Sequence, residues 1–599
     1  MGKVKVTKYS GFIKEGTTGK SLLCLFVLMC MVFSVAQGRD RMVRSGRYGG
    51  ELILSTTSDP KSFNPILAKE TSTTAITGVM FEGLTTIDPF TLLAIPNLAE
   101  KWESSSDGLT WSFHLRPGLR WSDGYPLTAD DVIFTFNDLI FNPRVPNSSR
   151  DIFTIDGKPV KVEKVDDLTV RFILPVKFAP FLRSLGQEIL PKHVLSSFVA
   201  AGKFNFAWGI DADIKSVVGT GPFRLVQYQP GQRVVLGRNP FYWKMSKEGD
   251  FLPYMDKLVF LIVPSLDVSL LKFMEGAVDS YNMRGMDYPL LKPLEKKRDF
   301  TVYDQGPDMG SNFIVLNQNA GTNEKTGKPF MASYKLAWFQ DVRFRQAIAY
   351  AVDKKRIIEI VKNGLGYPQY SPESPSVGFF YCDQVRKYDY DLAKARELLK
   401  EMGFEDRNKD GVLEDKDNHP LEFNLYANAD NTERVDIAAI IRNDLESLGM
   451  RVNFQLVEFN TLVSKLTSTF DWDAIVLGLT GSMDPHFGQN VWLSSGQLHM
   501  WNPKQKEPAT AWEKRLDEIF ALGAQELDEN KRKGYYDEYQ KIIADETPMI
   551  YTALSARLTA VRNRFGNIKP ALYGGVFHNL EEIYIKSESP MEGNHAGKK

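Results

Sequence analysis

The chain has 599 residues, which exceeds what one hydrophobic core supports, so we expect two or three domains. Hydrophobic residues make up 43% and charged residues 25% of the sequence, proportions that are ordinary for a globular protein. The net charge of −1 provides no positive field for a phosphate backbone, which argues against a nucleic-acid-binding protein.

The first 38 residues have the pattern of a secretory signal peptide. A lysine-rich start precedes an uncharged, mostly apolar run over 21–38, and the small residues Ala36 and Gly38 stand at cleavage spacing. A retained membrane anchor is the alternative, but the strongly apolar part, 22–36, is short for a membrane span. Cleavage would leave Cys382 as the last cysteine, so we expect an exported chain that core burial stabilises without an intramolecular disulfide.

Strand signals begin soon after this segment. Four runs are rich in apolar and β-branched residues and predict strands: 51–56, 223–228, 233–239 and 257–263. Pro230 and Gly231 lie between the second and third runs, and a Pro-Gly centre suits a tight turn. The second and third runs are therefore predicted to form a hairpin.

Helix signals alternate with the strands. Thr128 precedes two aspartates and is expected to be an N-cap. One continuous helix is predicted over 341–361, and two more are predicted to end at Gly403 and Gly449, which suit helix C-termini. A strand follows the last of these, and a further helix and a buried strand over 474–479 come after it. This alternation predicts a mixed α/β protein.

Five stretches together resemble one protein family. They are 52–70, 81–89, 98–136, 218–243 and 341–357, and they occur in the same order as in that family. The chain is similar over nearly all of its length after the signal segment to the extracytoplasmic solute-binding proteins of family 5, the oligopeptide-, dipeptide- and nickel-binding proteins of ABC importers.

The resemblance implies an α/β fold of the periplasmic-binding-protein-like type II, with two lobes, hinge strands and an extra inserted domain (cluster C). The implied domains are a signal peptide over 1–38, a first lobe over 39–92, 216–315 and 550–599, an inserted domain over 93–215, and a second lobe over 316–549. The Gly219-Thr220-Gly221-Pro222 phrase suits a crossover between domains, where we expect unusual backbone angles. It lacks the lysine and the following helix of a phosphate-binding loop.

The resemblance also implies a function. We expect a periplasmic or extracellular monomer that captures a peptide or peptide-like solute between its lobes, performs no chemistry on it and delivers it to the transmembrane subunits of an ABC permease. No cofactor is required. An oligosaccharide or a metal chelate is the alternative ligand, and a secreted hydrolase is the alternative of another class. The sequence has no GxSxG phrase and no paired-histidine spacing that would mark a catalytic centre.

Candidate ligand-binding residues follow from the family's cleft segments. They are Lys69, Glu70, Thr71, Asn282, Met283, Asn312, Phe313, Gly478, Leu479, Thr480, Ser482, Asp484, Phe487, Trp492 and Trp501. Ser482 stands where peptide-binding members hold the ligand's ammonium group with an aspartate, and Asp484 follows two residues later. The alternative for each aromatic residue is that it packs the lobe.

A separate twelve-residue stretch, 406–417, fits a calcium-loop pattern. Gly411 supplies the turn, and Glu414 at position nine would act through water. The candidate ligands are Asp406, Asn408, Asp410, Val412 (through its carbonyl) and Asp417. An aspartate at position twelve is shorter than the glutamate of an EF-hand, so a structural Ca²⁺ and a metal-free turn both remain open.

Overall fold

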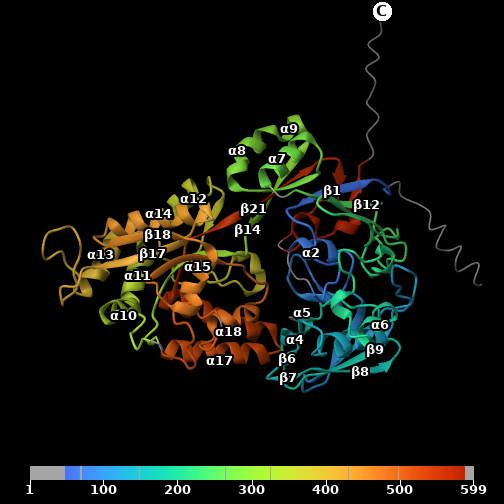
Figure 1. Cartoon of the computed structure of the whole chain (residues 1–599), viewed down its shortest axis with the longest axis horizontal. Coiled ribbons are helices and arrows are strands. Elements are labelled where there is room, and N and C mark those ends of the chain that lie inside the picture. The colour runs from blue at the N-terminus through green and yellow to red at the C-terminus, as the bar shows by residue number, and fades with distance from the viewer. Residues whose placement is uncertain are drawn as a thin grey trace, which may run out of the picture.

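The computed structural model describes residues 47–586 except 68–70, 148, 264, 324–325, 430, 497 and 572. The predicted signal segment lies outside the described residues, as do the candidate ligand residues Lys69 and Glu70. Among the described helices, none combines the length and apolar character that a bilayer crossing requires. Figure 1 shows two bodies side by side, with the chain before 300 mostly in one and the orange and yellow segments in the other.

A four-stranded sheet is built around the N-terminal strand. Its order is β1-β12-β11-β10, with β1 and β12 parallel and the other neighbours antiparallel. The strands are β1 (Glu51–Thr56), β12 (Lys257–Ile262), β11 (Arg233–Arg238) and β10 (Phe223–Gln229). These strands match the four predicted runs over 51–56, 223–228, 233–239 and 257–263 to within one residue. Gly231 has a φ of +68°, which confirms the tight turn of the predicted hairpin.

The chain between β1 and β10 contributes an antiparallel sheet of its own, the inserted sheet. Its order is β4-β5-β9-β8, formed by β4 (Ala99–Ser104), β5 (Thr110–Leu115), β9 (Thr169–Ile173) and β8 (Lys161–Asp166). Alternate residues of β5 are buried, including Phe113, which shares one apolar cluster with Leu52 of β1. This shared core joins the inserted sheet firmly to the sheet around β1.

The helix beside the inserted sheet is capped as predicted. Thr128 caps α3 (Ala129–Ile133), and its backbone N–H donates to Asp131 Oδ2 at 3.0 Å, which completes a capping box. The helical path continues as a π-helix over Phe134–Ile140. Two short helices follow β9: α5 (Phe181–Ser184) and α6 (Lys192–Ala200).

The second-lobe sheet has five strands in the order β18-β17-β19-β15-β20. They are β18 (Arg451–Val457), β17 (Glu422–Asn428), β19 (Ala474–Leu479), β15 (Ser311–Leu316) and β20 (Met549–Tyr551). Side chains of β15 alternate between two cores: Ile314 packs in one, and Phe313 packs in the other. The sheet is therefore covered on both faces, and its strands are rich in apolar residues for that reason.

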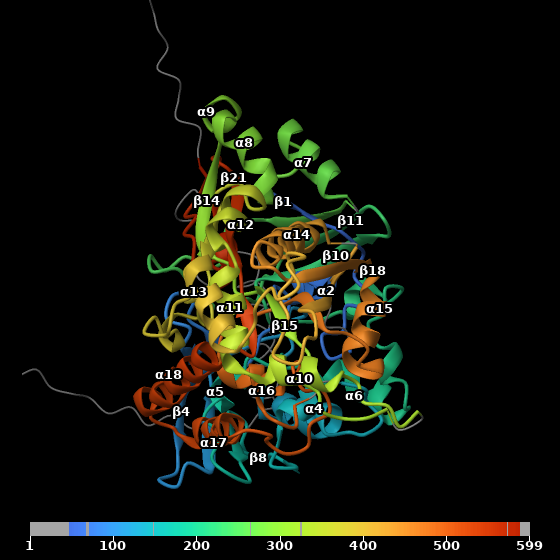
Figure 2. The ribbon, with the colours of Figure 1, turned by 90° about the vertical axis from the view of Figure 1, so that its left-hand side faces the viewer.

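Helices on either face of this sheet complete the second lobe. The core that contains Ile314 is closed by α11 (Val342–Ala351), α13 (Leu392–Glu401) and α14 (Thr432–Glu446). The core that contains Phe313 is closed by α17 (Ala511–Gln525) and α18 (Glu529–Glu546). Figure 2 looks onto this lobe, with α11 and α13 side by side and α17 and α18 below them.

Two antiparallel segments carry the chain between the two bodies, and we call them the crossing segments. In one, β14 (Phe300–Pro307) leads into β15. In the other, β20 leads into β21 (Ala553–Arg562). β14 pairs with β21, which also pairs with β13 (Ser280–Met283), while β15 pairs with β20. The strand that starts at Ser311 already pairs in the second-lobe sheet, ahead of the predicted boundary at 316. The domain boundaries themselves stay predictions.

Two local predictions were wrong. The single helix expected over 341–361 is two helices, because Val352 is extended and Asp353 caps a new helix, α12 (Lys354–Ile360). Gly219 and Gly221 are not among the residues with positive φ. Their role is close approach, because an added Cβ would lie 2.0 Å from the Met80 carbonyl oxygen at Gly219 and 2.5 Å from that of Val79 at Gly221.

Candidate functional site

A polar pocket of about 500 Å³ opens where the second-lobe sheet meets the crossing segments, and we call it the cleft pocket. Its wall includes the end of β19, the start of β15 and the first turn of α14. The lining residues are Asp308, Met309, Gly310, Ser311, Asn312, Asn431, Glu433, Arg434, Gly478, Leu479, Thr480, Gly481 and Ser555. The structure thus brings together four predicted residues: Asn312, Gly478, Leu479 and Thr480.

A chain of polar contacts crosses the floor of the cleft pocket. Asn312 Nδ2 donates to Glu433 Oε1 at 2.9 Å, and Arg434 Nε donates to Asn312 Oδ1 at 3.2 Å. Lys362 Nζ, from a nearly fully buried side chain, donates to Glu433 Oε1 at 2.7 Å and to Ser555 Oγ at 2.8 Å. The side-chain amide of Asn312 is therefore held in one orientation, between the carboxylate of Glu433 and the guanidinium of Arg434.

Two glycines of the loop after β19 leave room for this arrangement. A Cβ on Gly478 would lie 2.6 Å from both Arg434 Nη2 and Asn312 Oδ1, and one on Gly481 would lie 2.2 Å from the Met309 carbonyl oxygen. The loop over 478–481 therefore approaches the first crossing segment through its backbone, which glycine permits because it has no Cβ.

Sequence reasoning missed Lys362, Glu433, Arg434 and Ser555. The helix predicted to end at Gly449 was given no start, and the structure shows that it is α14, which begins at Thr432 with Asn431 as its N-cap. An asparagine followed by a glutamate in the first turn is a recognisable helix start, so Glu433 and Arg434 were open to prediction. Ser555 lines the pocket, and Lys362 contacts two of its lining residues, in both cases only through tertiary packing.

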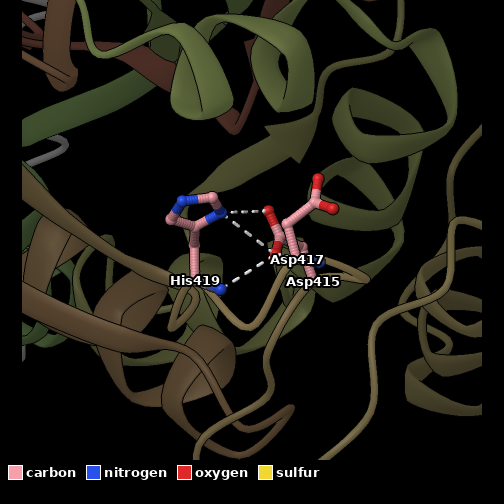
Figure 3. Close-up of side chains that lie close together, drawn as sticks. All are labelled: Asp415, Asp417 and His419. Atoms are coloured by element: carbon pink, nitrogen blue, oxygen red, sulfur yellow. Dashed lines mark hydrogen bonds and ion pairs between the residues drawn. The ribbon is translucent and has the colours of Figure 1, made fainter.

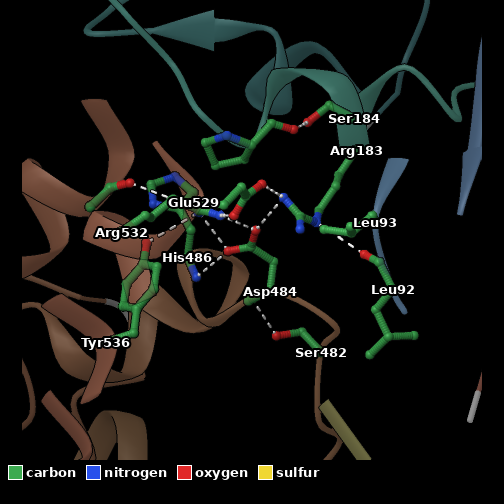
Figure 4. A network of polar contacts seen from close by, with 12 residues as sticks. Leu92, Leu93, Arg183, Ser184, Ser482, Asp484, His486, Glu529, Arg532 and Tyr536 are labelled. Atoms are coloured by element: carbon green, nitrogen blue, oxygen red, sulfur yellow. Dashed lines mark hydrogen bonds and ion pairs between the residues drawn. The ribbon is translucent and has the colours of Figure 1, made fainter. Parts of the chain in front are cut away.

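Asp484 does not line the cleft pocket. Its side chain is fully buried, and both oxygens accept hydrogen bonds from Arg532, at 2.6 Å to Oδ2 and 2.7 Å to Oδ1 (Figure 4). Burial alone would raise the pKa of Asp484, but the guanidinium groups of Arg532 and Arg183 outweigh it and hold the pKa below its usual value. The prediction that Asp484 is a ligand-binding residue is therefore wrong for this arrangement, because both of its oxygens are bonded to Arg532 in a fully buried position. Ser482 donates to the Asp484 carbonyl at 2.9 Å.

The same ion network joins the inserted sheet's side of the molecule to the second lobe. Arg183, on α5, places Nη1 3.5 Å from Asp484 Oδ2 and 2.8 Å from Glu529 Oε1 at the start of α18. Its Nε donates to the Leu92 carbonyl at 3.3 Å. Figure 4 shows Arg183 and Arg532 approaching Asp484 from opposite sides. We call Arg183, Asp484, Glu529 and Arg532 the Asp484 network.

The neighbouring loop residues lie in this interdomain contact. His486 is buried beside Phe178, with ring centroids 5.3 Å apart, and burial lowers the pKa of His486 to about 4. Phe487 is 39% exposed and lines two larger pockets: one of about 830 Å³ between the second lobe and the inserted region, and one of about 840 Å³ whose wall also includes first-lobe residues. Its contact with a ligand stays a prediction.

Other predicted contacts belong to cores. Trp492 and Trp501 are buried, and the Trp492 ring lies 5.1 Å from that of Tyr539. Trp501 Nε1 donates to Glu513 Oε1 at 3.0 Å. Phe313 is fully buried in the same core because β15 alternates, so Asn312 alone of that pair lines the pocket. These three aromatic residues pack the second lobe, and their predicted ligand contact was wrong.

The last predicted residues lie near the crossing segments. Met283, the last residue of β13, is buried in an apolar cluster that also contains Leu558 of β21. Asn282 is exposed and accepts a hydrogen bond from Thr559 Oγ1 at 3.1 Å, and neither residue lines the cleft pocket. Thr71 begins α2 (Thr71–Thr77), and its side chain is not described.

The predicted calcium loop divides into two groups. Ligand atoms of Asp406, Asp410 and Glu414 lie within 4.8 Å of one another, and a second group contains Asp415, Asp417 and His419. Figure 3 shows the second group, in which His419 Nδ1 lies 3.1 Å from Asp415 Oδ2. Asp417 therefore belongs to a different group from Asp406 and Asp410, with which the calcium-loop pattern had placed it. Asn408 accepts the Asp410 backbone N–H at 2.8 Å.

Comparison with known proteins assigns this architecture to a family. The family model for bacterial extracellular solute-binding proteins, family 5, matches residues 94–499. A probable ABC transporter-binding protein of Deinococcus radiodurans is 29% identical over 529 residues, which cover 84% of this chain and 87% of the relative. The oligopeptide-binding protein AppA of Bacillus subtilis is 28% identical over 556 residues, with 89% and 93% covered.

The solved structure of AppA from Bacillus subtilis in complex with a nonapeptide superposes with a TM-score of 0.66 at 25% identity, and the match covers 91% of this chain and 100% of the AppA chain. The predicted fold, a type II α/β protein of two lobes with an extra domain, is thereby confirmed. The match of the family model over more than half of the sequence, together with these relatives, shows that the chain belongs to family 5 of the bacterial extracellular solute-binding proteins.

Proposed function

We propose that this protein is the receptor of an ABC importer and that it binds a peptide or peptide-like solute in the cleft pocket. The observation that carries the proposal is the pocket's wall, which combines the backbone of the 478–481 loop with the guanidinium of Arg434 and the carboxylates of Asp308 and Glu433. A peptide carries an ammonium group, a carboxylate and backbone amides. These groups complement the carboxylates, the guanidinium and the backbone of the wall, respectively. The relative AppA, which binds oligopeptides, supports the same ligand class.

The charged groups of the wall suggest how such a ligand is oriented. Because Arg532 and Arg183 neutralise Asp484, the ligand's ammonium group needs another partner, and Asp308 is an exposed carboxylate at the crossing segment. Arg434, held against Asn312, is the partner for the ligand's carboxylate. Closure about the crossing segments would bring the first lobe over the bound ligand.

The proposal extends to the protein's place in the cell. The first 38 residues would direct export, the mature chain would act as a monomer outside the cytoplasm, and an ABC permease would take up the ligand without chemical change. The membership of the family, whose members are extracellular solute-binding proteins, supports these assignments.

Titration calorimetry with short synthetic peptides tests the pocket. Arg434→Ala and Asp308→Asn should each weaken binding by about tenfold or more, since each removes a charge-assisted hydrogen bond. Lys394→Ala, at an exposed i,i+3 pair on α13, is the control and should bind as the wild type does. Unchanged affinity in both pocket variants would place the ligand elsewhere, and a wild type that binds no peptide would refute the ligand class.

A further inference from the structure

The loop between α13 and β17 gathers acidic side chains that the proposed ligand site does not use. Ligand oxygens of Asp406, Asp410 and Glu414 lie within 4.8 Å of one another, on a segment that links a helix to a central strand. Three carboxylates at such distances repel each other unless a cation or protons compensate their charge. The question is whether the surrounding protein supplies that compensation.

Nearby basic groups supply little of it. The Arg407 guanidinium is directed at the backbone carbonyls of Gly403, Glu414 and Asp415, at 2.7–2.8 Å, so it does not face the three carboxylates. Arg451 Nη2 lies 3.6 Å from Asp410 Oδ2, but Arg451 also pairs with Glu422 at 3.3 Å. Within the described residues, no salt bridge reaches Asp406 or Glu414.

A second, independent observation points to a ligand. Glu414 is 4% exposed, and its Oε1 has no hydrogen-bond partner among the described residues. Asp406 Oδ1 is likewise buried and lacks a partner in the described part of the chain. The opposite oxygens are bonded, Glu414 Oε2 to the Arg407 backbone N–H at 2.7 Å and Asp406 Oδ2 to that of Gly411 at 3.1 Å. In each of these two carboxylates, one oxygen is held by a backbone N–H and the other oxygen has no partner. Burial of that second oxygen costs desolvation free energy, which a bound cation would offset.

We propose that Asp406, Asp410 and Glu414 form a calcium site. All of the candidate ligand atoms are oxygens, which Ca²⁺ prefers. The three carboxylates together carry enough negative charge to balance the two positive charges of the ion. Glu414 binds the ion directly through Oε1, in place of the water-mediated contact that position nine makes in an EF-hand. Asn408 lies in the same loop, where its Oδ1 accepts the Asp410 backbone N–H.

In the second acidic group of the loop, the protein itself supplies partners for both oxygens of Asp415. Asp415 Oδ1 accepts the backbone N–H groups of Asp417 and His419, and Oδ2 accepts from Trp338 Nε1 at 3.2 Å as well as facing His419. The His419 ring stacks on Tyr334, with centroids 4.2 Å apart. Asp415 is therefore fully used by the protein, and Asp417, at the position that the calcium-loop pattern assigns, is exposed beside it.

Calcium titration of the chelator-treated full-length protein tests the site by calorimetry and thermal unfolding. We expect a dissociation constant of about 10⁻⁴–10⁻³ M, as in extracellular calcium modules, and a rise in Tm with saturation. Glu414→Gln and Asp406→Asn should each weaken binding at least about tenfold. Asp417→Asn is the matched control in the same loop and should bind Ca²⁺ within about twofold of the wild type.

Two results would overturn the proposal. One is a wild type that shows neither heat nor a Tm shift at about ten times the expected dissociation constant. The other is loss of binding in Asp417→Asn with retention in Glu414→Gln, which would restore the EF-hand ligand assignment. Circular dichroism of each variant distinguishes lost binding from lost folding, and Asp410→Asn, an exposed position, provides a further variant if Glu414→Gln does not fold.

Discussion

Two buried carboxylates, Asp484 and Glu373, differ in the partners that the protein gives them. This difference predicts how the stability of the protein depends on pH. Asp484 has two arginines, whereas the described partner of Glu373 is Tyr539, whose hydroxyl lies 3.2 Å from Glu373 Oε1. Burial raises the pKa of Glu373 to about 7, and the nearby Asp484 charge adds to the effect. The folded state therefore favours the protonated acid at a position where the unfolded chain ionises.

The sign of the resulting pH dependence follows by linkage. Between pH 4.5 and about 7 the folded state holds a proton on Glu373 that the unfolded state has lost, so this group lowers the free energy of unfolding as pH rises through that window. Full ionisation would cost about 3 kcal/mol. Glu373→Gln should remove this slope, so its stability relative to the wild type should rise from pH 5 to pH 8 in urea unfolding. A constant difference across that range would contradict the assignment.

At the scale of elements, local sequence signals predicted the positions of strands and helix caps. They failed where the burial of a side chain depends on tertiary packing. The strand at Glu51–Thr56, the hairpin at Gly231 and the Thr128 cap depend on neighbouring residues and were predicted from them. The candidate site was predicted in part. Asn312 and the end of β19 line the pocket, whereas Trp492 and Trp501 face a core, and the exposure of an aromatic ring depends on helices distant in sequence.

One helix contains a residue that weakens it. Gly534 lies within α18, is exposed, and has open space where a Cβ would stand. Gly534→Ala should raise the free energy of unfolding by about 0.5–1 kcal/mol, because alanine loses less backbone entropy in a helix. Chemical denaturation measures this. A destabilised variant would mean that the surroundings of α18 differ from those described.

The Asp484 network predicts a mechanical link between elements. Arg183→Ala removes the only member contributed by α5 and should cost about 1.5–3 kcal/mol, since the Arg183 side chain is 4% exposed and hydrogen-bonded to a charged group. Hydrogen exchange should accelerate in α5 and at the start of α18. Arg386→Ala, whose exposed side chain pairs with Asp545 at 2.8 Å, is the control and should change little. Equal exchange in both variants would show that the network carries no such link.

At the scale of the whole molecule, contacts at two separate places connect the two bodies among the described residues. The crossing segments join them covalently, and the Asp484 network joins them on another side, where Phe178 also packs against His486. The division into two lobes was predictable from the family resemblance. The placement of the ion network was not, because Arg183 and Asp484 are about 300 residues apart in sequence and meet only in the folded chain.

A receptor must bind its peptide and leave it intact, and both properties can be measured for this protein. Native mass spectrometry of the purified chain, after incubation with a defined pool of short peptides, measures both properties at once. We expect a complex of one chain with one peptide of unchanged mass, and a smaller fraction of that complex in Arg434→Ala. A spectrum without any peptide complex, or with shortened peptides accumulating in the pool, would contradict it.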